Sequence, residues 1–489
     1  MRARALTQYV RGGCTTLLVV LLSSTWSQGQ SQPSQGPTLQ QLKDKLQQLE
    51  QSMQELKGQI GALEQAQAAP ATPQAAPAQP ALTQTSAPPP VPAAAQLTAI
   101  KPEKPAATEK PQTTMDLYGF AMTDTGYDFG QTDPNWFDVM RPTKLPAFAN
   151  EFGANGNVYF SVRQTRFGVK TSTPTALGDL KTQFEFEMFG TGVDAGQTTF
   201  RLRKAYGELG PLLVGQTNSV FMDIDVFPNS LEYWGPNGMV FFRNIQIRYT
   251  PIRTDHTELA LALERPGASA DQGVYSDRIE LSNIKPHFNL PDFSWHVRET
   301  RKWGYVQLAG MVRKIGWTDN NATPTLNLSG TAVGWGLNLS SNLNFGPKDV
   351  GKFEVVYGSG VENYMNDAPI DIGVKNNFSN PVTPITGVAL PLLGVVSFLD
   401  HTWSDRFTSS IGYSMLDIHN SNAETPSDFH QGHYALGNLL FHPVPKVTIG
   451  SEFQYGRRVN FSDGFNVNDY RLQFSFKYNW DKSFGVPGI

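Results

Sequence analysis

Arginines recur along the chain at positions that a β-strand turns to one face, while large apolar residues occupy the other face. In the segment 200–206, this alternation separates Arg201 and Arg203 from Phe200 and Leu202. Charged side chains at alternate positions require water on their side, because burying an isolated charge is costly. Rows of basic side chains that face water attract and select anions. The same parity predicts further inward-facing arginines at Arg248, Arg298, Arg313 and Arg471.

Arg163 and Arg166 form a second candidate pair of anion-binding side chains. A regular strand would place them on opposite faces, because their separation in the sequence is odd. Both can face inward only if the strand is irregular between them. The spacing therefore predicts a β-bulge near Gln164 and Thr165.

Two glutamates are placed to pair with the arginines. Glu185 and Glu187 share one face of the strand that precedes Arg201 and Arg203. Cross-strand pairing would neutralise part of the positive charge and hold the side chains rigid. Two interpretations stay open: the arginines line a pathway for anions, or they only stiffen a wall through ion pairs.

An acidic and aromatic segment at 216–238 is the second candidate functional element. It contains Asp223, Asp225 and Glu232 together with several aromatic residues. If this loop folds into a pore, its carboxylates would face the arginines across a narrow gap, and the opposed charges would create a transverse field. The alternative is an ordinary extracellular loop.

The strands that must position these charges are amphipathic with a period of two. In Thr331–Phe345, the positions of Val333, Trp335 and Leu337 alternate with glycine, asparagine and serine. The outward faces of a soluble sandwich usually carry charge, whereas this polar face is small and uncharged. An apolar exterior against lipid and a wet interior explain the pattern.

About sixteen such strands can be assigned, an even number as single-chain outer-membrane barrels require. Connections after even-numbered strands are tight, whereas those after odd-numbered strands are mostly long. A transmembrane barrel sorts its loops in this way, with the short turns in the periplasm. The predicted strands span 116–128, 157–171, 180–190, 198–208, 211–217, 239–250, 255–264, 291–299, 303–317, 331–345, 350–360, 394–403, 406–418, 431–441, 446–458 and 467–481.

Residues 1–114 have a different organisation from the barrel predicted for 115–489. Residues 1–29 have the positive start, short apolar core and small residues of an export signal. Leucines and other apolar residues repeat with heptad spacing over 38–65, which predicts a short periplasmic coiled coil; the alternative is a lone amphipathic helix. The stretch 66–114 is rich in proline and alanine and cannot bury a core, so we expect a disordered linker.

Composition limits the function classes. The 489 residues carry a formal net charge of −4 with 39% hydrophobic and 17% charged residues, which gives no indication of nucleic-acid binding. The eight histidines show no metal-ligand spacing on a shared helix, and no nucleophile–base pair is visible. We therefore expect no enzyme activity, no metal and no cofactor, with an outer-membrane hydrolase as a remote alternative.

Four segments together resemble the DcaP-like porins of Gram-negative outer membranes: Asp116-Leu-Tyr-Gly-Phe120, Arg163-Gln-Thr-Arg-Phe-Gly168, Arg201-Leu-Arg-Lys-Ala-Tyr206 and Val214-Gly-Gln-Thr217. The resemblance covers the whole mature chain. It implies a homotrimer of sixteen-stranded barrels, a periplasmic coiled coil, and a loop after the fifth strand that narrows the pore. It also implies uptake of dicarboxylate-like anions past a basic wall of Arg163, Arg166, Arg201, Arg203, Arg243 and Arg248.

The sequence therefore predicts an all-β, sixteen-stranded transmembrane barrel in the outer membrane, which carries small anionic solutes by passive diffusion. Arg298 and Arg313 are further candidates for the pore wall. The expected partners are the solute, the outer-membrane lipid and, through the coiled coil, the periplasm or cell wall. One alternative is a phosphate-selective or general porin. Another is a surface anchor or adhesin whose barrel only holds the coiled coil and loops.

Overall fold

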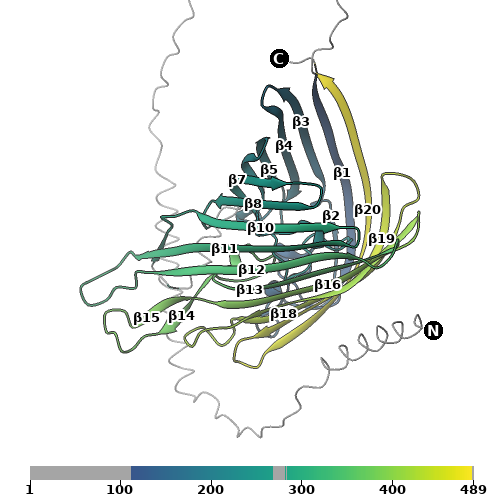
Figure 1. Cartoon of the computed structure of the whole chain (residues 1–489). Coiled ribbons are helices and arrows are strands. Elements are labelled where there is room, and N and C mark those ends of the chain that lie inside the picture. The colour runs from purple at the N-terminus through teal and green to yellow at the C-terminus, as the bar shows by residue number, and fades with distance from the viewer. Residues whose placement is uncertain (1–111, 268–280, 282–283, 487–489) are drawn as a thin grey trace, which may run out of the picture. The chain divides into compact units, whose positions relative to one another are not determined.

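The computed structural model describes residues 112–267, 281 and 284–486. Eighteen strands form one antiparallel sheet, and β14 and β15 form a separate hairpin (Figure 1). The strands are β1 (Thr113–Asp128), β2 (Asn157–Ser161), β3 (Arg166–Thr175), β4 (Gly178–Phe189), β5 (Thr198–Leu209), β6 (Leu212–Asn218), β7 (Arg243–Arg253), β8 (Thr257–Glu264), β9 (Ile284–His287), β10 (Asp292–Arg301), β11 (Gly304–Asp319), β12 (Gly330–Asn344), β13 (Asp349–Ser359), β14 (Ile372–Asn376), β15 (Ile385–Ala389), β16 (Pro391–Ser404), β17 (Phe407–Ile418), β18 (Phe429–Phe441), β19 (Val447–Asn460) and β20 (Asn466–Val486). Short 3-10 helices occur at η1 (Pro134–Trp136), η2 (Pro142–Lys144), η3 (Gly192–Asp194), η4 (Ile224–Val226) and η5 (Glu362–Tyr364).

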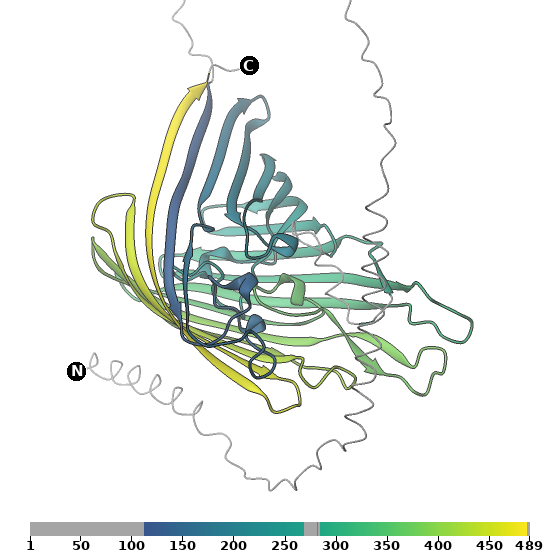
Figure 2. The ribbon, with the colours of Figure 1, turned by 180° about the vertical axis from the view of Figure 1, so that it is seen from behind.

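The sheet closes on itself, because β1 pairs with β20 from Thr113↔Val486 to Asp128↔Arg471. Both β2 and β3 pair with β1, so they are two parts of one wall strand. In the same way, β9 and β10 both pair with β11. The eighteen strands of the sheet therefore make sixteen wall strands, as the sequence predicted (Figures 1 and 2).

The two rims differ in the length of their connections. Tight turns fill one rim, at 176–177, 210–211, 254–256, 302–303, 345–348, 405–406 and 442–446. Longer loops lie at the other rim, and three of them matter below: L1 (129–156), L3 (219–242) and L6 (360–390), which contains the β14–β15 hairpin. Short turns mark the periplasmic side of a transmembrane barrel, so the long loops are extracellular. No helix within the described residues is long and apolar enough to cross a membrane.

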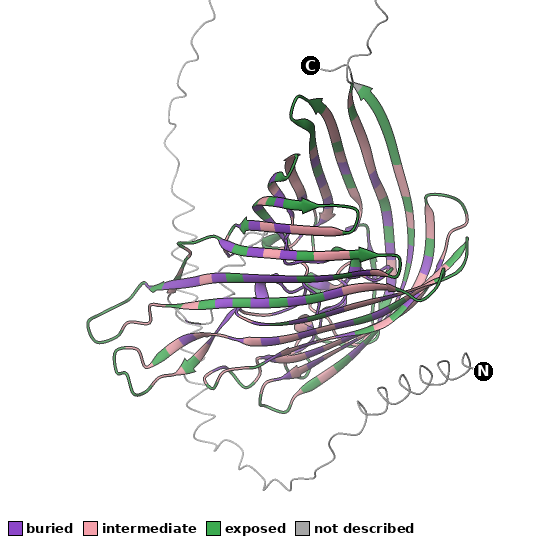
Figure 3. Ribbon diagram, in the orientation of Figure 1, coloured by how far each residue is buried: buried purple, intermediate pink, exposed green. Residues whose placement is uncertain are grey.

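Side chains alternate between an apolar outer face and a polar inner face. On β12, Val333 is 63% exposed and Leu339 is 51% exposed, whereas Asn338 and Ser340 are buried inside the barrel. Figure 3 shows buried and exposed residues alternating along this strand. The outer face is apolar because it meets lipid, and the inner face can hold charge because the lumen contains water.

Most predicted strands agree with the structure to within a few residues, and the differences are local. The predicted irregularity near Gln164 and Thr165 is a four-residue break between β2 and β3 rather than a single bulge. Strand β1 begins at Thr113, so the last residues assigned to the linker belong to the barrel. The predicted export signal, the coiled coil and most of the linker lie outside the described residues.

The loops L1, L3 and L6 fold into the lumen and build a core inside the barrel. Phe221 and Val240 from L3 pack with Tyr364 from L6 against the inner faces of β11, β13, β16 and β17. A second cluster joins Met140 from L1 and Met239 from L3 to β16 and β18. These contacts fill the lumen on the side of β11–β18.

Candidate functional site

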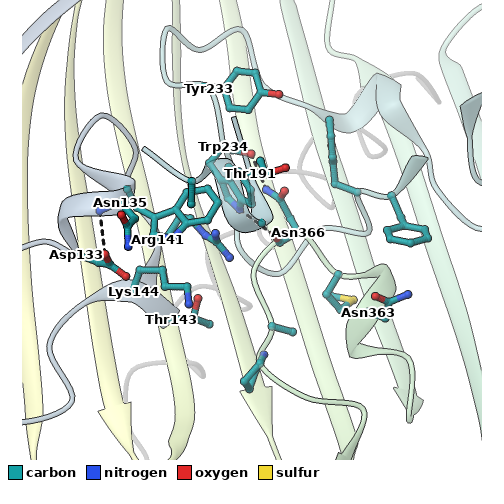
Figure 4. Close-up of a pocket in the computed structure, with 18 of the residues that line it drawn as sticks. Asp133, Asn135, Arg141, Thr143, Lys144, Thr191, Tyr233, Trp234, Asn363 and Asn366 are labelled. Atoms are coloured by element: carbon teal, nitrogen blue, oxygen red, sulfur yellow. Dashed lines mark hydrogen bonds between the residues drawn. The ribbon is translucent and has the colours of Figure 1, made fainter. Parts of the chain in front are cut away.

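The opposite side of the lumen contains a cavity of about 410 Å³ between the three inward loops and the strands β5 and β7. Figure 4 shows its polar lining, with Arg141 of L1 and Asn366 of L6 beside Trp234 of L3, and Asn363 of L6 farther away. The positively charged residues that line it are Arg141, Lys144, Arg201 and Arg243, and Asp133 is the acidic residue of the lining. The cavity therefore has an excess of positive charge, within a low-dielectric wall that strengthens its field.

The wall behind the cavity is a network of arginines and glutamates. Arg203 on β5 donates to Glu185 at 2.9 Å and to Glu187 at 2.5 Å, both on β4. Arg166 on β3 lies 3.4 Å from Glu187, and Arg243 on β7 lies 3.8 Å from the same carboxylate. Three arginines thus share two carboxylates, which leaves the network with a positive excess. The predicted cross-strand pairing of Arg203 with both glutamates is confirmed.

L3 is fastened to this network by an aromatic residue. The Tyr233 hydroxyl donates to Glu187, and the Tyr233 ring stacks on Phe189 of β4 with centroids 3.9 Å apart. Because Glu187 also holds arginines of three strands, the position of L3 and that of the charges are coupled. The loop after the fifth wall strand therefore narrows the lumen beside the arginines.

Arg141 connects the three loops at the extracellular side of the cavity. Its guanidinium contacts the rings of both Trp136 and Trp234, 4.1 and 4.0 Å from their centroids, and the two rings pack edge to face. Its Nε donates to Asp367 of L6 at 2.9 Å, and Trp234 Nε1 donates to the carbonyl of Asn366 at 2.8 Å. Cation–π contacts and the ion pair together hold L1, L3 and L6 in one arrangement.

The acidic residues of L3 contact the packed side of the barrel rather than facing the arginine wall. Asp223 accepts hydrogen bonds from the hydroxyls of Tyr305 on β11, at 2.7 Å, and Ser340 on β12, at 2.6 Å. Asp225 pairs with Arg298 on β10 at 2.5 Å. These carboxylates therefore meet one predicted pore arginine, Arg298, by direct contact and do not face Arg201 and Arg203 across a gap, because their partners lie on β10–β12.

Glu232 is buried where L3 crosses L1. Its carboxylate accepts from the backbone N–H of Met140 at 3.1 Å and from the Tyr434 hydroxyl at 3.3 Å. Burial, reinforced by the nearby charge of Glu452, raises the pKa of Glu232 to about 7. This residue holds two loops together and does not line the cavity.

Two of the predicted arginines are enclosed by protein. Arg163 is 1% exposed and pairs with Asp138 of L1 at 2.5 Å. Arg313 is also buried, 3.2 Å from Asp292 and 3.2 Å from Asp371 of L6. The inward parity predicted for Arg313 is confirmed, and Arg163 lies in the irregular segment between β2 and β3, but inward loops cover both side chains and their contacts are structural.

Three other predicted arginines also lie outside the cavity lining. Arg248 on β7 donates to the backbone carbonyl of Asn218 at 2.6 Å and to the Gln246 side chain at 3.0 Å. Arg471 is buried against Asp128 at 2.5 Å. Arg298 on β10 pairs with Asp225 of L3. Of the arginines proposed from the sequence, the structure therefore places Arg201 and Arg243 in the cavity lining and Arg166 and Arg203 in the adjoining network.

Sequence reasoning did not find Arg141 and Lys144, because they lie in L1 rather than on a strand. The available signal was the content of the loop: Trp136, Phe137 and Val139 occur within a short stretch that would be exposed in an ordinary surface loop. Apolar side chains at this density indicate that a loop packs against something. Within the part of the chain that the structure describes, no group of three or more His, Cys, Asp or Glu could hold a metal ion.

A closed antiparallel barrel with an apolar exterior, a charged lumen and inward-folded loops defines an outer-membrane porin architecture. The model of the DcaP outer membrane protein family matches residues 94–480. The chain belongs to this family, and its location is the outer membrane of a Gram-negative bacterium.

Three solved structures are similar to this chain at low sequence identity, and the first of them shares its fold. The outer membrane channel DcaP of Acinetobacter baumannii matches with 18% identity and a TM-score of 0.61, over 75% of this chain and 97% of that one. The anion-selective porin from Comamonas acidovorans matches with 10% identity and a TM-score of 0.48, over 75% and 100%. OmpT of Vibrio cholerae matches with 12% identity and a TM-score of 0.45, over 75% and 98%. No curated protein sequence matches this chain.

Proposed function

We propose that this porin is an anion-selective channel for passive uptake of small anionic solutes, with dicarboxylates as the expected substrates. The observation that carries the proposal is the charge of the cavity lining: Arg141, Lys144, Arg201 and Arg243 against Asp133. Basic side chains in a narrow pore attract anions and repel cations. A pore that binds through several weak contacts also releases the solute, which diffusion requires.

The spacing of the positive groups supports solutes with two anionic ends. Arg141 and Lys144 come from L1, whereas Arg201 and Arg243 come from the barrel wall, so the cavity presents cations on two sides. A dicarboxylate can contact both sets at once, while a monocarboxylate satisfies one. Charge-assisted hydrogen bonds from arginine to carboxylate are well suited to this recognition.

Reversal potentials of single channels in a KCl gradient test the selectivity. We expect anion preference in the unmodified chain, and a loss of about threefold or more in the anion/cation permeability ratio for Arg201→Gln with Arg243→Gln, because two lining charges are removed. Lys302→Gln with Lys348→Gln removes the same charge at the periplasmic turns and is expected to leave the ratio almost unchanged. A cation-selective pore in the unmodified chain would contradict the proposal.

Competition experiments separate the substrate classes. We expect succinate to reduce chloride current at lower concentrations than acetate does. Stronger block by inorganic phosphate than by succinate would favour a phosphate-selective porin, and equal weak effects would favour a general porin.

We further propose that the barrel assembles as a homotrimer, and that the predicted coiled coil at 38–65 extends into the periplasm and supports assembly or contacts the cell wall. The heptad spacing of the segment supports this assignment. Crosslinking of the full chain and of a chain lacking 38–65 measures the contribution of the segment.

The packed loops on the β11–β18 side favour one alternative of a different class, in which the barrel is a plugged anchor for surface loops. Conductance distinguishes the two functions. An anchor with a closed lumen would pass no steady current in a planar bilayer, whereas the proposed porin conducts.

A further inference from the structure

The outer wall of the barrel carries a continuous apolar row near its extracellular half. Cross-strand pairing aligns outward side chains of β7, β8, β10, β11 and β12 in one row across the strands. Each of these side chains is at least 40% exposed. The members of the row are Ile247, Leu263, Phe293, Val312 and Trp335. The row marks a part of the wall that contacts hydrocarbon chains.

Basic side chains occupy the outward positions directly beyond this row, toward the extracellular rim. Lys314 follows Val312 on the same face of β11. Lys285 and His287 lie on the same outer face, because they pair with Thr318 and Gly316 of β11. Figure 1 shows β8, β10, β11 and β12 side by side in this wall.

Arg265 extends this set of cations from the end of β8. Its backbone N–H still bonds to the carbonyl of Ile245 at 2.8 Å, so the strand alternation continues and places its exposed side chain on the outer face with Leu263. The name basic outer patch is used below for Arg265, Lys285, His287 and Lys314.

The basic outer patch has no ion pair with a carboxylate among the described residues. Carboxylates on the adjoining strand ends point inward, as the burial of Glu264, Asp292 and Asp319 shows. At the periplasmic rim the arrangement differs, because Arg253 pairs with Glu208 at 2.8 Å. Within 112–267 and 284–486, the patch therefore concentrates positive charge beside a lipid-facing surface without an ion-paired carboxylate.

We propose that the basic outer patch binds the phosphate groups of a phosphorylated lipid headgroup in the outer leaflet. The patch lies beyond the apolar row toward the extracellular rim, as a headgroup lies beyond acyl chains that run along that row. Three strongly basic side chains on neighbouring strands can contact one or two phosphates, and each contributes to the attraction of anionic lipid. The site lies outside the lumen and is independent of the solute pathway.

Lipid retention by the full chain in nanodiscs tests this binding. The probes are diphosphoryl lipid A, its monophosphoryl form and a neutral phospholipid, and native mass spectrometry counts the bound molecules. The unmodified chain is expected to retain diphosphoryl lipid A most strongly. Arg265→Gln with Lys285→Gln and Lys314→Gln is expected to lower this affinity about 100-fold, at about fivefold per charge.

A matched variant removes the same number of cations at the periplasmic turns: Lys302→Gln with Lys348→Gln and Arg406→Gln. It is expected to retain the lipid as the unmodified chain does. Equal retention by the two triple variants, or equal retention of diphosphoryl and neutral lipids by the unmodified chain, would overturn the proposal. So would full displacement of the lipid by millimolar inorganic phosphate, because the site would then recognise the free ion. Conductance measurements check that both triple variants insert into the membrane as the same barrel.

Discussion

The inward-facing positions of the strands carry different kinds of side chain on the two sides of the lumen. On β3, β4, β5 and β7, these positions carry charges that border the cavity. On β11, β13, β16, β17 and β18, they carry mainly apolar side chains that pack against L1, L3 and L6. The first wall holds its charges in an ion-pair network beside the cavity, whereas the second hides apolar surface from water. We refer to these regions as the charged wall and the packed wall.

Arginines on the two walls differ in role although their sequence pattern is the same. Arg243 on the charged wall lines the cavity and lies 3.8 Å from its nearest carboxylate. Arg313 on the packed wall is buried between Asp292 and Asp371. Parity places both side chains inward, but the path of the loops decides which of them meets solute. The following variants separate stability, expected from the packed wall, from selectivity, expected from the charged wall.

The largest stability effect is expected at Tyr364, which anchors L6 to the packed wall. Its buried ring lies 4.6 Å from that of Phe242, and its hydroxyl donates to Asp292 at 2.9 Å. Tyr364→Ala is expected to lower the free energy of unfolding by about 3–5 kcal/mol, because it leaves a cavity in the core. Urea unfolding in detergent micelles measures this change.

Tyr364→Phe is the matched control for this substitution. It keeps the ring and removes one hydrogen bond to a carboxylate, which costs about 1.5–3 kcal/mol. Neither variant is expected to change the anion/cation permeability ratio. Equal destabilisation by the two variants would show that packing of the ring contributes little.

A double-mutant cycle tests the ion pair that joins L1 to L6. Because Arg141 and Asp367 are almost fully buried, Arg141→Met and Asp367→Asn are expected to show a coupling energy of about 1–3 kcal/mol in urea unfolding. The exposed pair Arg253–Glu208 at the periplasmic rim is the control, with an expected coupling of about 0.2–1 kcal/mol. A coupling at Arg141 no larger than at the rim would mean that the indole rings, rather than Asp367, position the guanidinium.

The wall of the barrel was predictable from the sequence because each strand carries its own pattern. The predicted strand 180–190 corresponds to Gly178–Phe189, and 198–208 corresponds to Thr198–Leu209. Alternation in a strand is a local property, and lipid outside with water inside makes that property unambiguous. The pairing of Arg203 with Glu185 and Glu187 was predictable for the same reason.

The loops inside the lumen were not predictable in the same way. Arg141 meets Asp367, which lies 226 positions away in the chain, and neither residue belongs to a periodic segment. Arg313 has the predicted parity and Arg163 lies in the predicted irregularity, but the burial of both depends on where L1 and L6 run. Long-range loop packing leaves a weak trace in sequence, chiefly the presence of apolar residues such as Trp136 in a segment expected to face water.

A pH dependence is expected at the crossing of L1 and L3. The pKa of Glu232 in the folded chain is about 7, above its ordinary value near 4.5, so the folded state binds the proton more tightly. The stability from this residue is therefore complete below pH 4.5, declines as the pH rises to about 7, and stays lost above it. Glu232→Gln is expected to remove this part of the decline in thermal melts between pH 5 and 8.

Glu151→Gln, a change in L1 outside this crossing, serves as the control for Glu232→Gln. It is expected to retain the decline between pH 5 and 8. An unchanged pH profile in Glu232→Gln would assign the decline to other carboxylates.

The smallest effect is expected at Lys144, which lines the cavity from L1 rather than from the charged wall. Lys144→Gln is expected to lower the anion/cation permeability ratio about twofold in 0.1 M KCl, because a single charge at the edge of the cavity acts through a field that salt screens. In 1 M KCl the screening length falls to about 3 Å, so the difference from the unmodified chain should nearly vanish. Arg243→Gln, on the charged wall and mostly buried, should retain more of its effect at high salt because buried charge is screened less. If Lys144→Gln were as salt-resistant as Arg243→Gln, the solute would contact Lys144 directly, and the selective region would include L1 as fully as the wall.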